Sequence, residues 1–356
     1  MAHFNLTGRS SFPAELVDSI IDHNHSDPAT LMICSLVSRQ WIASSRYHLF
    51  STVAISHDNA REFVQLLSSP LCTVSTAIQG MDVHFVPGSQ RWFGEFARRL
   101  ILLNNVTIVS LGISGSGNTV IREEVQIALP TLSVRTKVLN VGPGVVFGTF
   151  SEFARLLCTF HALQSLSCSC TFQIKDRAQG VHFNSPLSQV YLVTPAIKLV
   201  SELLLSQGVL PTIASLSMSH LVQDDYPTLS TFLATPNENL HSLAIRMDSS
   251  FSGTTLDSFT EDVKLTQLKV LLKLSIETDP KLSPEQAFRL LARITSSSLK
   301  TVEITVALEQ GAARVDMLLS GDQFPSLKEL KILGSSWADA RQFLPRCNAN
   351  NILKEY

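Results

Sequence analysis

The strongest constraint on the fold is a pattern of apolar residues that recurs through residues 57–356. Each copy has one apolar residue, two residues of any kind, an apolar residue, one residue of any kind, and a third apolar residue. Such alternation predicts a strand with one buried face, and helical patterns such as 196–205 and 284–294 lie between the copies. Successive copies start 24 to 31 residues apart, at Ile78, Val106, Thr136, Leu163, Leu187, Ile213, Leu240, Leu271, Leu299 and Leu327.

Strands that alternate with helices at this period predict parallel pairing. Each strand–helix unit is too small to bury its own apolar face, so the units are expected to stack. The expected fold is α/β, in which residues 57–356 form an irregular solenoid with a curved parallel sheet inside and helices outside. The pattern is similar to that of leucine-rich repeats, which run about 20–29 residues with L-x-x-L-x-L on the strand. The copies lack the asparagine or cysteine that regular repeats carry three residues further on. They therefore resemble degenerate repeats, and a compact α/β domain is the alternative fold.

Residues 12–50 have a different pattern, which predicts three short helices. Pro13 suits the first turn of a helix, and Asp27-Pro28 is typical of a helix start. We expect Leu16, Ile20 and Ile21 to share one face of the first helix. About forty residues make a poor independent core, so the excess apolar side chains predict a partner protein that covers them.

The order of residues in this region resembles an F-box, whose usual pattern is LP-x-E-[LI]…I…L…C-x-x-V-[SC]-[RK]-x-W. The resemblance covers about forty residues, and phenylalanine stands at position 12 where the family commonly has leucine. Together with degenerate leucine-rich repeats, it is similar to the fungal type of F-box protein. The matching residues are Phe12-Pro13-x-Glu15-Leu16, then Ile20-Ile21, then Cys34-Ser35-Leu36-Val37-Ser38-Arg39-Gln40-Trp41.

The resemblance implies a substrate-recognition subunit of an SCF-type cullin–RING ubiquitin ligase. Residues 10–56 would bind a Skp-family adaptor and through it a cullin, and residues 57–356 would bind an unknown target protein. Such a subunit is not an enzyme, because the chemistry belongs to other subunits. The alternative is a scaffold that binds the adaptor or another partner without directing ubiquitination. The residues implied to face the adaptor, unless they simply form an internal helical core, are Phe12, Pro13, Leu16, Ile20, Val37 and Trp41.

The inner face of the expected sheet offers candidates for target binding. Side chains between the apolar positions should point away from the core. They are mostly small and polar, with mixed charge towards the C-terminus, so no stripe of one sign identifies an acidic or basic target. Aromatic and arginine side chains often anchor interfaces, although a solvated strand face is the alternative. The candidate residues are Tyr191, Arg246, Lys273 and Glu303.

Composition excludes several other classes of protein. A net charge of −2 argues against nucleic-acid binding, which needs a basic face. No run of 18 apolar residues predicts a membrane span, and the N-terminus lacks the apolar region of a secretory signal. Six cysteines without a CxxC pair predict reduced thiols in a cytoplasmic or nuclear protein.

The sequence predicts no catalytic site, metal or cofactor. The pair His23 and His25 lies in a short polar stretch, and Cys168-Ser169-Cys170 has poor spacing for a disulfide or a metal site. The glycine-rich segment 112–117 fits neither a nucleotide-binding motif nor the nucleophile elbow of a hydrolase. We expect it to form a loop after a strand.

Overall fold

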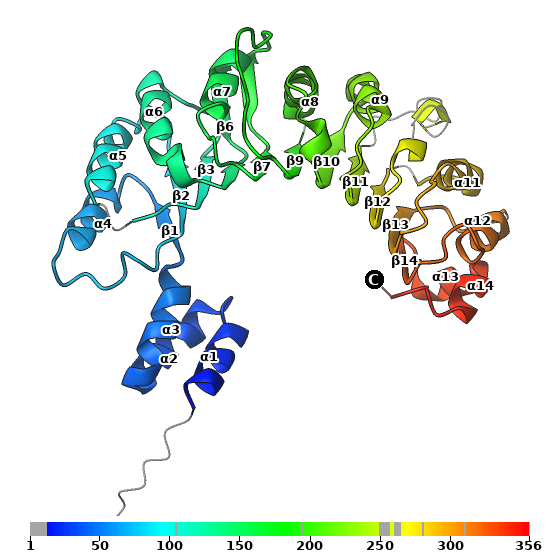
Figure 1. Cartoon of the computed structure of the whole chain (residues 1–356), viewed down its shortest axis with the longest axis horizontal. Coiled ribbons are helices and arrows are strands. Elements are labelled where there is room, and N and C mark those ends of the chain that lie inside the picture. Colours follow the sequence, from blue (N-terminus) through cyan, green and yellow to red (C-terminus); the bar gives the residue numbers. More distant parts are fainter. Residues whose placement is uncertain are drawn as a thin grey trace, which may run out of the picture.

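The protein is an α/β chain built around one open, curved parallel sheet. The structure is a computed structural model that describes residues 13–103, 106–193, 195–248, 257–259, 265–279, 281–309 and 311–355. The sheet has 11 strands in the order β1-β2-β3-β5-β7-β9-β10-β11-β12-β13-β14. Figure 1 shows these strands along the inner side of an arc and the helices along its outer side. The predicted α/β class, with a large curved parallel sheet, is thus confirmed.

The strands coincide with the repeated apolar pattern, with two exceptions. The second copy was predicted at Val106, Val109 and Leu111, but Leu111 pairs with Met81 and Ile113 with Val83, so this copy starts two residues later. The first strand, β1, was missed by the pattern. The strands of the large sheet are β1 (Thr52–Ile55), β2 (Gly80–Phe85), β3 (Ser110–Gly115), β5 (Val138–Val141), β7 (Ser165–Cys168), β9 (Gln189–Val193), β10 (Ser215–Leu221), β11 (Ser242–Met247), β12 (Lys273–Glu277), β13 (Thr301–Thr305) and β14 (Glu329–Leu333).

The outer layer consists of helices that follow the strands. Two of these helices begin with a capping box, in which Thr149 pairs with Glu152 and Ser283 with Gln286. Such reciprocal bonds satisfy the free amides of a first helical turn. The helices are α4 (Ala60–Leu67), α5 (Trp92–Leu102), α6 (Glu123–Ala128), α7 (Phe150–Leu157), α8 (Ala196–Ser206), α9 (Tyr226–Ala234), α11 (Pro284–Ala292), α12 (Ala312–Leu319), α13 (Trp337–Phe343) and α14 (Pro345–Ala349), with 3-10 turns η1 (Leu129–Arg135), η2 (Leu210–Thr212), η3 (Gln223–Asp225) and η4 (Leu265–Gln267).

A second, small parallel sheet accompanies the middle of the arc. It contains β4 (Thr119–Val120), β6 (Val145–Thr149) and β8 (Thr171–Ile174) in that order. The glycine-rich segment 112–117 was predicted as a loop after a strand, but β3 includes residues 112–115, and only Ser116 and Gly117 lie in the bend that follows. A Cβ atom on Gly112 would stand 2.0 Å from Oδ1 of Asp82. The glycine at this position is therefore explained by a close approach of β2, not by a turn.

The buried side chains form one continuous apolar core between the sheet and the outer helices. Along each strand the apolar side chains point into the core between the sheet and the helices. Most of the side chains between them lie on the open inner face and are exposed or half-buried, as predicted. Thr305 departs from this rule, since it was expected on the open inner face but is only 5% exposed.

The N-terminal helices form a separate unit with its own small core. Helices α1 (Ala14–His23), α2 (Pro28–Val37) and α3 (Arg39–Phe50) lie in the predicted places, and Asp27 caps α2 as expected. Among the described residues, the core of this unit contains Val17, Ile21 and Leu31, with Trp41 and Leu49 packed against it, and Cys34 of α2 is also buried. We call α1 to α3 the three-helix unit.

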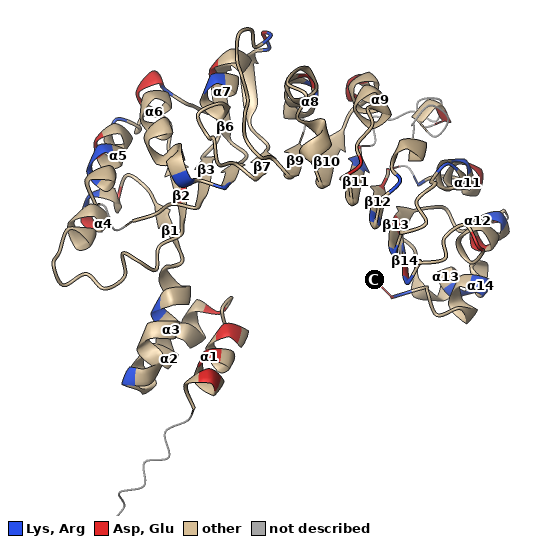
Figure 2. Ribbon diagram, in the orientation of Figure 1, with Lys and Arg blue, Asp and Glu red and all other residues tan. Residues whose placement is uncertain are grey.

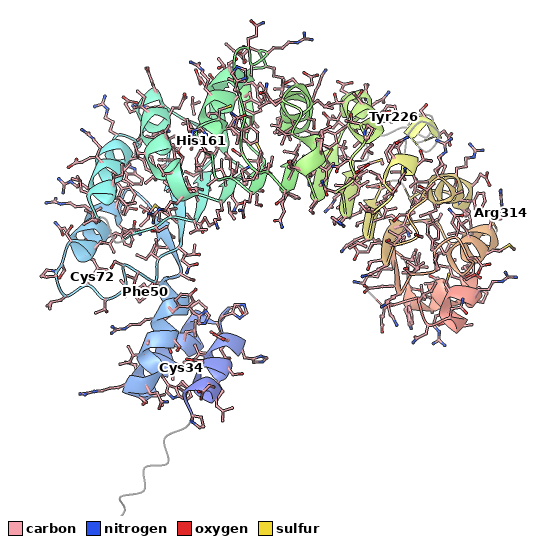
Figure 3. All side chains as sticks on the ribbon, in the orientation of Figure 1. Cys34, Phe50, Cys72, His161, Tyr226 and Arg314 are labelled. Carbon is pink, nitrogen blue, oxygen red and sulfur yellow. The ribbon has the colours of Figure 1, made fainter. Side chains whose placement is uncertain are left out.

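The three-helix unit is joined to the end of the arc through α3. Helix α3 runs directly into β1, and Figure 3 shows Phe50 at this junction. The Arg46 guanidinium donates to Oγ1 of Thr73 at 3.1 Å, and the Gln79 amide donates to the Tyr47 hydroxyl at 3.0 Å. The predicted boundary at residue 56 falls just after β1, which is already paired with β2.

A buried carboxylate holds the C-terminal end of the arc together. Asp316 is 2% exposed, and its two oxygens accept from the backbone amides of Arg346 at 3.0 Å and Cys347 at 2.9 Å. Beyond α14, the segment 352–354 bonds to Leu330 of β14 and so covers the last edge of the sheet.

We predict that Asp316→Ala loosens this end of the arc. Two buried amides lose their acceptor, which costs about 1–3 kcal/mol each when nothing replaces it. Hydrogen exchange at Arg346 and Cys347 should accelerate by about tenfold or more, whereas the exposed Asp322→Ala should leave both amides unchanged. Unchanged exchange in Asp316→Ala would show that the carboxylate does not hold α14.

Candidate partner-binding surfaces

Helix α1 has a buried side and an exposed apolar side. Val17 and Ile21 are 1% and 0% exposed, whereas Leu16 and Ile20 are 52% and 41% exposed. The prediction that Ile21 shares a face with Leu16 and Ile20 was therefore wrong. Residues four apart lie above one another on a helix, so Ile21 aligns with Val17 in the core and Leu16 aligns with Ile20 outside it.

Helix α2 exposes a more extensive apolar surface. It carries no Lys, Arg, Asp or Glu, as Figure 2 shows. Leu31 and Cys34 face the core, and the other side of the helix is open to solvent. We define the α2 face as the exposed residues Ala29, Met32, Ile33, Leu36 and Val37, of which Met32 is 55%, Ile33 64%, Leu36 86% and Val37 64% exposed.

The spacing of the α2 face is that of a helix that docks into a groove. Positions 29, 32, 33 and 36 follow the i, i+3, i+4, i+7 pattern of such anchors. Met32, Ile33 and Leu36 were not among the predicted adaptor-facing residues. The signal that could have found them is the absence of charge throughout Pro28–Val37.

The other predicted adaptor-facing residues take different places. Phe12 lies outside the described residues. Pro13 is exposed, and its carbonyl accepts from the amides of Leu16 and Val17 at the start of α1. Trp41 is half-buried against the small core, where it fastens α3 to α1 and α2.

Exposed apolar side chains are concentrated on the three-helix unit. Among the described residues, seven of the eighteen exposed large apolar side chains lie between Leu16 and Tyr47. Clustered exposed apolar residues such as those of the α2 face commonly mark a site of protein association. The three-helix unit is therefore the strongest candidate docking surface of the chain.

The inner face of the arc holds the four candidate target-binding residues, which do not form one cluster. Tyr191 on β9 is 42% exposed and stands between Ser167 and Ser217 of the neighbouring strands. Tyr191 is thus a large side chain among small, uncharged neighbours. The charged side chains of β12 to β14 lie on other strands, further towards the C-terminal end of the sheet.

The charged candidates lie further along the sheet and pair with each other or with neighbours. Lys273 lies 3.0 Å from Glu303, and Arg246 lies 3.6 Å from Glu277. Lys331 approaches Glu303 to 3.6 Å from the other side. Because these charges have partners within the chain, they offer less to a target than isolated charges would.

We predict a small, pH-dependent contribution of Glu303 to stability. Burial raises the pKa of Glu303, but the hydrogen bond and charge of Lys273 outweigh this effect and hold the pKa below its ordinary 4.5. The carboxylate therefore stabilises the fold at neutral pH, and this stabilisation is lost as the pH falls through the lowered pKa.

Glu303→Gln should accordingly lower the free energy of unfolding at pH 7 by less than about 1 kcal/mol, since the Lys273 side chain is 46% exposed and solvent screens the pair. Urea titrations of variant and wild type should converge once the pH is well below 4.5. A difference that persists unchanged in acid would contradict an electrostatic origin.

The described residues contain no group of three or more His, Cys, Asp or Glu side chains that could hold a metal ion. Cys168 and Cys170 are both buried with their sulfur atoms 3.4 Å apart, and burial together with the hydrogen bond between the two thiols raises the pKa of Cys170. A thiol whose pKa is raised, as that of Cys170 is, makes a poor nucleophile and a poor metal ligand. Within the part of the chain that the structure describes, no helix is long and apolar enough to cross a bilayer.

Comparison with known proteins adds a distant structural likeness. No family model matches the chain, and no curated protein matches it. Among solved structures, the chain is similar to a protein from Bacteroides fragilis, with 12% identity over 80% of this chain and 74% of that chain and a TM-score of 0.28.

Proposed function

We propose that the chain is the substrate-recognition subunit of an SCF-type ubiquitin ligase. In this proposal the three-helix unit binds a Skp-family adaptor and the arc binds the target protein. The observation that carries it is the exposed α2 face on a helix whose surrounding residues follow the F-box order.

The α2 face is costly to leave in water. Burying a side chain such as Leu36, Ile33 or Met32 stabilises a complex by about 1.5–3 kcal/mol each. A few such anchors usually dominate an interface, while the residues around them exclude water. An apolar groove on the adaptor that receives α2 accounts for this arrangement.

The small core of the three-helix unit supports the same proposal. Among the described residues, four buried apolar residues, with two more packed against them, are few for thirty-odd residues of helix. A partner that binds only the folded unit stabilises it by mass action. Adaptor binding and folding of this unit are therefore expected to be coupled.

The arc is suited to hold a second protein. Its inner face is a continuous strip of mostly small and polar side chains across the large sheet. Curved repeat surfaces of this kind bind extended areas of a partner. Hydrogen bonds of Arg46 and Tyr47 link the three-helix unit to the end of the arc.

Affinity mass spectrometry with the full chain tests the proposal. Wild-type chain should co-purify with the Skp-family adaptor and a cullin, and Leu36→Asp should lose both but keep any protein bound to the arc. A retained protein should also have a longer half-life in cells that express only the variant. Loss of adaptor without any change in half-life would favour a scaffold over a ligase subunit, and absence of the adaptor from the wild-type sample would refute the proposal.

A further inference from the structure

The small parallel sheet ends at β8, although the large sheet continues past it. Each of its strands follows a strand of the large sheet: β4 follows β3, β6 follows β5 and β8 follows β7. After β9 the pattern changes, because α8 starts at Ala196, directly after the end of β9 at Val193. In the described residues, β8 thus has β6 on one side and no strand on the other.

The outer edge of β8 has no backbone partner among the described residues. In a parallel ladder every second residue turns its N–H and C=O to the same side, so half of the backbone groups of β8 point away from β6. Within the described part of the chain, residues 171–174 make backbone hydrogen bonds only with β6. Ile174, the last residue of β8, is 60% exposed. A free edge with an exposed apolar residue is a template for an added strand.

A hollow of about 350 Å3 lies beside the segment that directly follows β8, and it is also lined by the start of α8 and by the segment after β10. Lys175 and Arg177 come from the segment directly after Ile174, and Lys198 comes from the first turn of α8. All three side chains are exposed, and among the described residues none has an acidic partner within 4.0 Å.

The acidic residues nearby are partly committed to the fold. The Asp176 carboxylate accepts from the Ser151 amide at 3.0 Å, and the Asp225 carboxylate accepts from the Val222 amide at 3.2 Å. Glu202 and Asp224 also line the hollow. Because Lys175 and Arg177 directly follow Ile174, a strand paired with β8 would run beside these two basic side chains.

We propose that the free edge of β8 binds an extended acidic peptide segment, which adds a fourth strand to the small sheet. Backbone hydrogen bonds between the peptide and β8 supply affinity, and an apolar side chain of the peptide packs on Ile174. An Asp or Glu of the peptide beside Lys175, Arg177 and Lys198 supplies specificity. This site lies on the rim of the arc and is independent of the α2 face, so it goes beyond the proposed ligase function.

Selection of short random peptides displayed on phage against the full chain tests this site. Enriched peptides should be rich in β-branched residues and carry Asp or Glu. Synthetic copies, measured by fluorescence anisotropy, should bind Lys175→Glu/Arg177→Glu about tenfold or more weakly than wild type, because each close charge pair becomes repulsive. Copies with alternate amides N-methylated should weaken similarly, since they cannot complete the ladder.

Matched controls separate this site from general charge effects. Lys269→Glu/Lys300→Glu changes the net charge equally at two exposed lysines elsewhere, and it should leave peptide binding unchanged. Failure to enrich acidic peptides, or equal binding to both double variants, would overturn the proposal. Insensitivity to N-methylation would equally exclude strand addition.

Discussion

Leu36→Asp should weaken the binding of a Skp-family adaptor to the full chain by about a hundredfold or more. Leu36 is 86% exposed on the α2 face, so its replacement by aspartate removes an apolar anchor and forces a charge into an apolar groove. Truncation of a central anchor commonly costs 2 kcal/mol or more, and an unpaired buried charge adds to this cost. Isothermal titration calorimetry of variant and wild type measures the difference.

The fold itself should be unaffected by this change, because the side chain makes little contact within the chain. Leu102→Asp is the matched control: this leucine is 79% exposed at the end of α5, on the arc. It should bind the adaptor like wild type. Equal affinities for Leu36→Asp and Leu102→Asp would contradict a role for the α2 face.

Phe153→Ala should produce the largest loss of stability that we predict. Phe153 is fully buried on α7, and its ring lies 5.1 Å from that of Phe147 and 5.6 Å from that of Phe172, measured between centroids. These rings join α7 to both β6 and β8. Removal of a buried phenylalanine leaves a cavity and costs about 3–5 kcal/mol, which a shift of the urea midpoint would measure.

The loss of stability caused by Phe153→Ala should also be local. Units of a repeat array contact chiefly their neighbours, so destabilisation of one unit spreads little to distant ones. Hydrogen exchange should accelerate most in α7, β6 and β8, and little in β12 to β14. Ile127→Ala, at a residue that is 68% exposed, should change stability by less than about 0.5 kcal/mol. A uniform acceleration across the arc would contradict this view of its cooperativity.

The sequence predicted the large sheet well because strand alternation and period agree. The second copy was misplaced because Val106 and Val109 are apolar like Ile108, so two registers fit the same pattern. β1 was missed because it is four residues long and follows α3 without a break. The small sheet escaped prediction because its strands are two to five residues long and follow closely on strands of the large sheet.

The candidate docking surface was predicted only in part. The resemblance to an F-box predicted Leu16, Ile20 and Val37 as docking residues, and these three side chains are exposed. It did not lead to Met32, Ile33 and Leu36, because a helix that is apolar on both sides has no amphipathic pattern to separate core from surface. Only the packing of Leu31 and Cys34 decides which side of α2 is free.

Two methionines offer the most direct test of the central claim. Met32 on the α2 face and Met317 on α12 are each 55% exposed, so they should be oxidised by peroxide at similar rates in the free chain. With saturating Skp-family adaptor, oxidation of Met32 should slow by about tenfold or more while that of Met317 stays constant, because only the α2 face is covered. Equal oxidation of Met32 with and without the adaptor would show that this face is not where a partner binds.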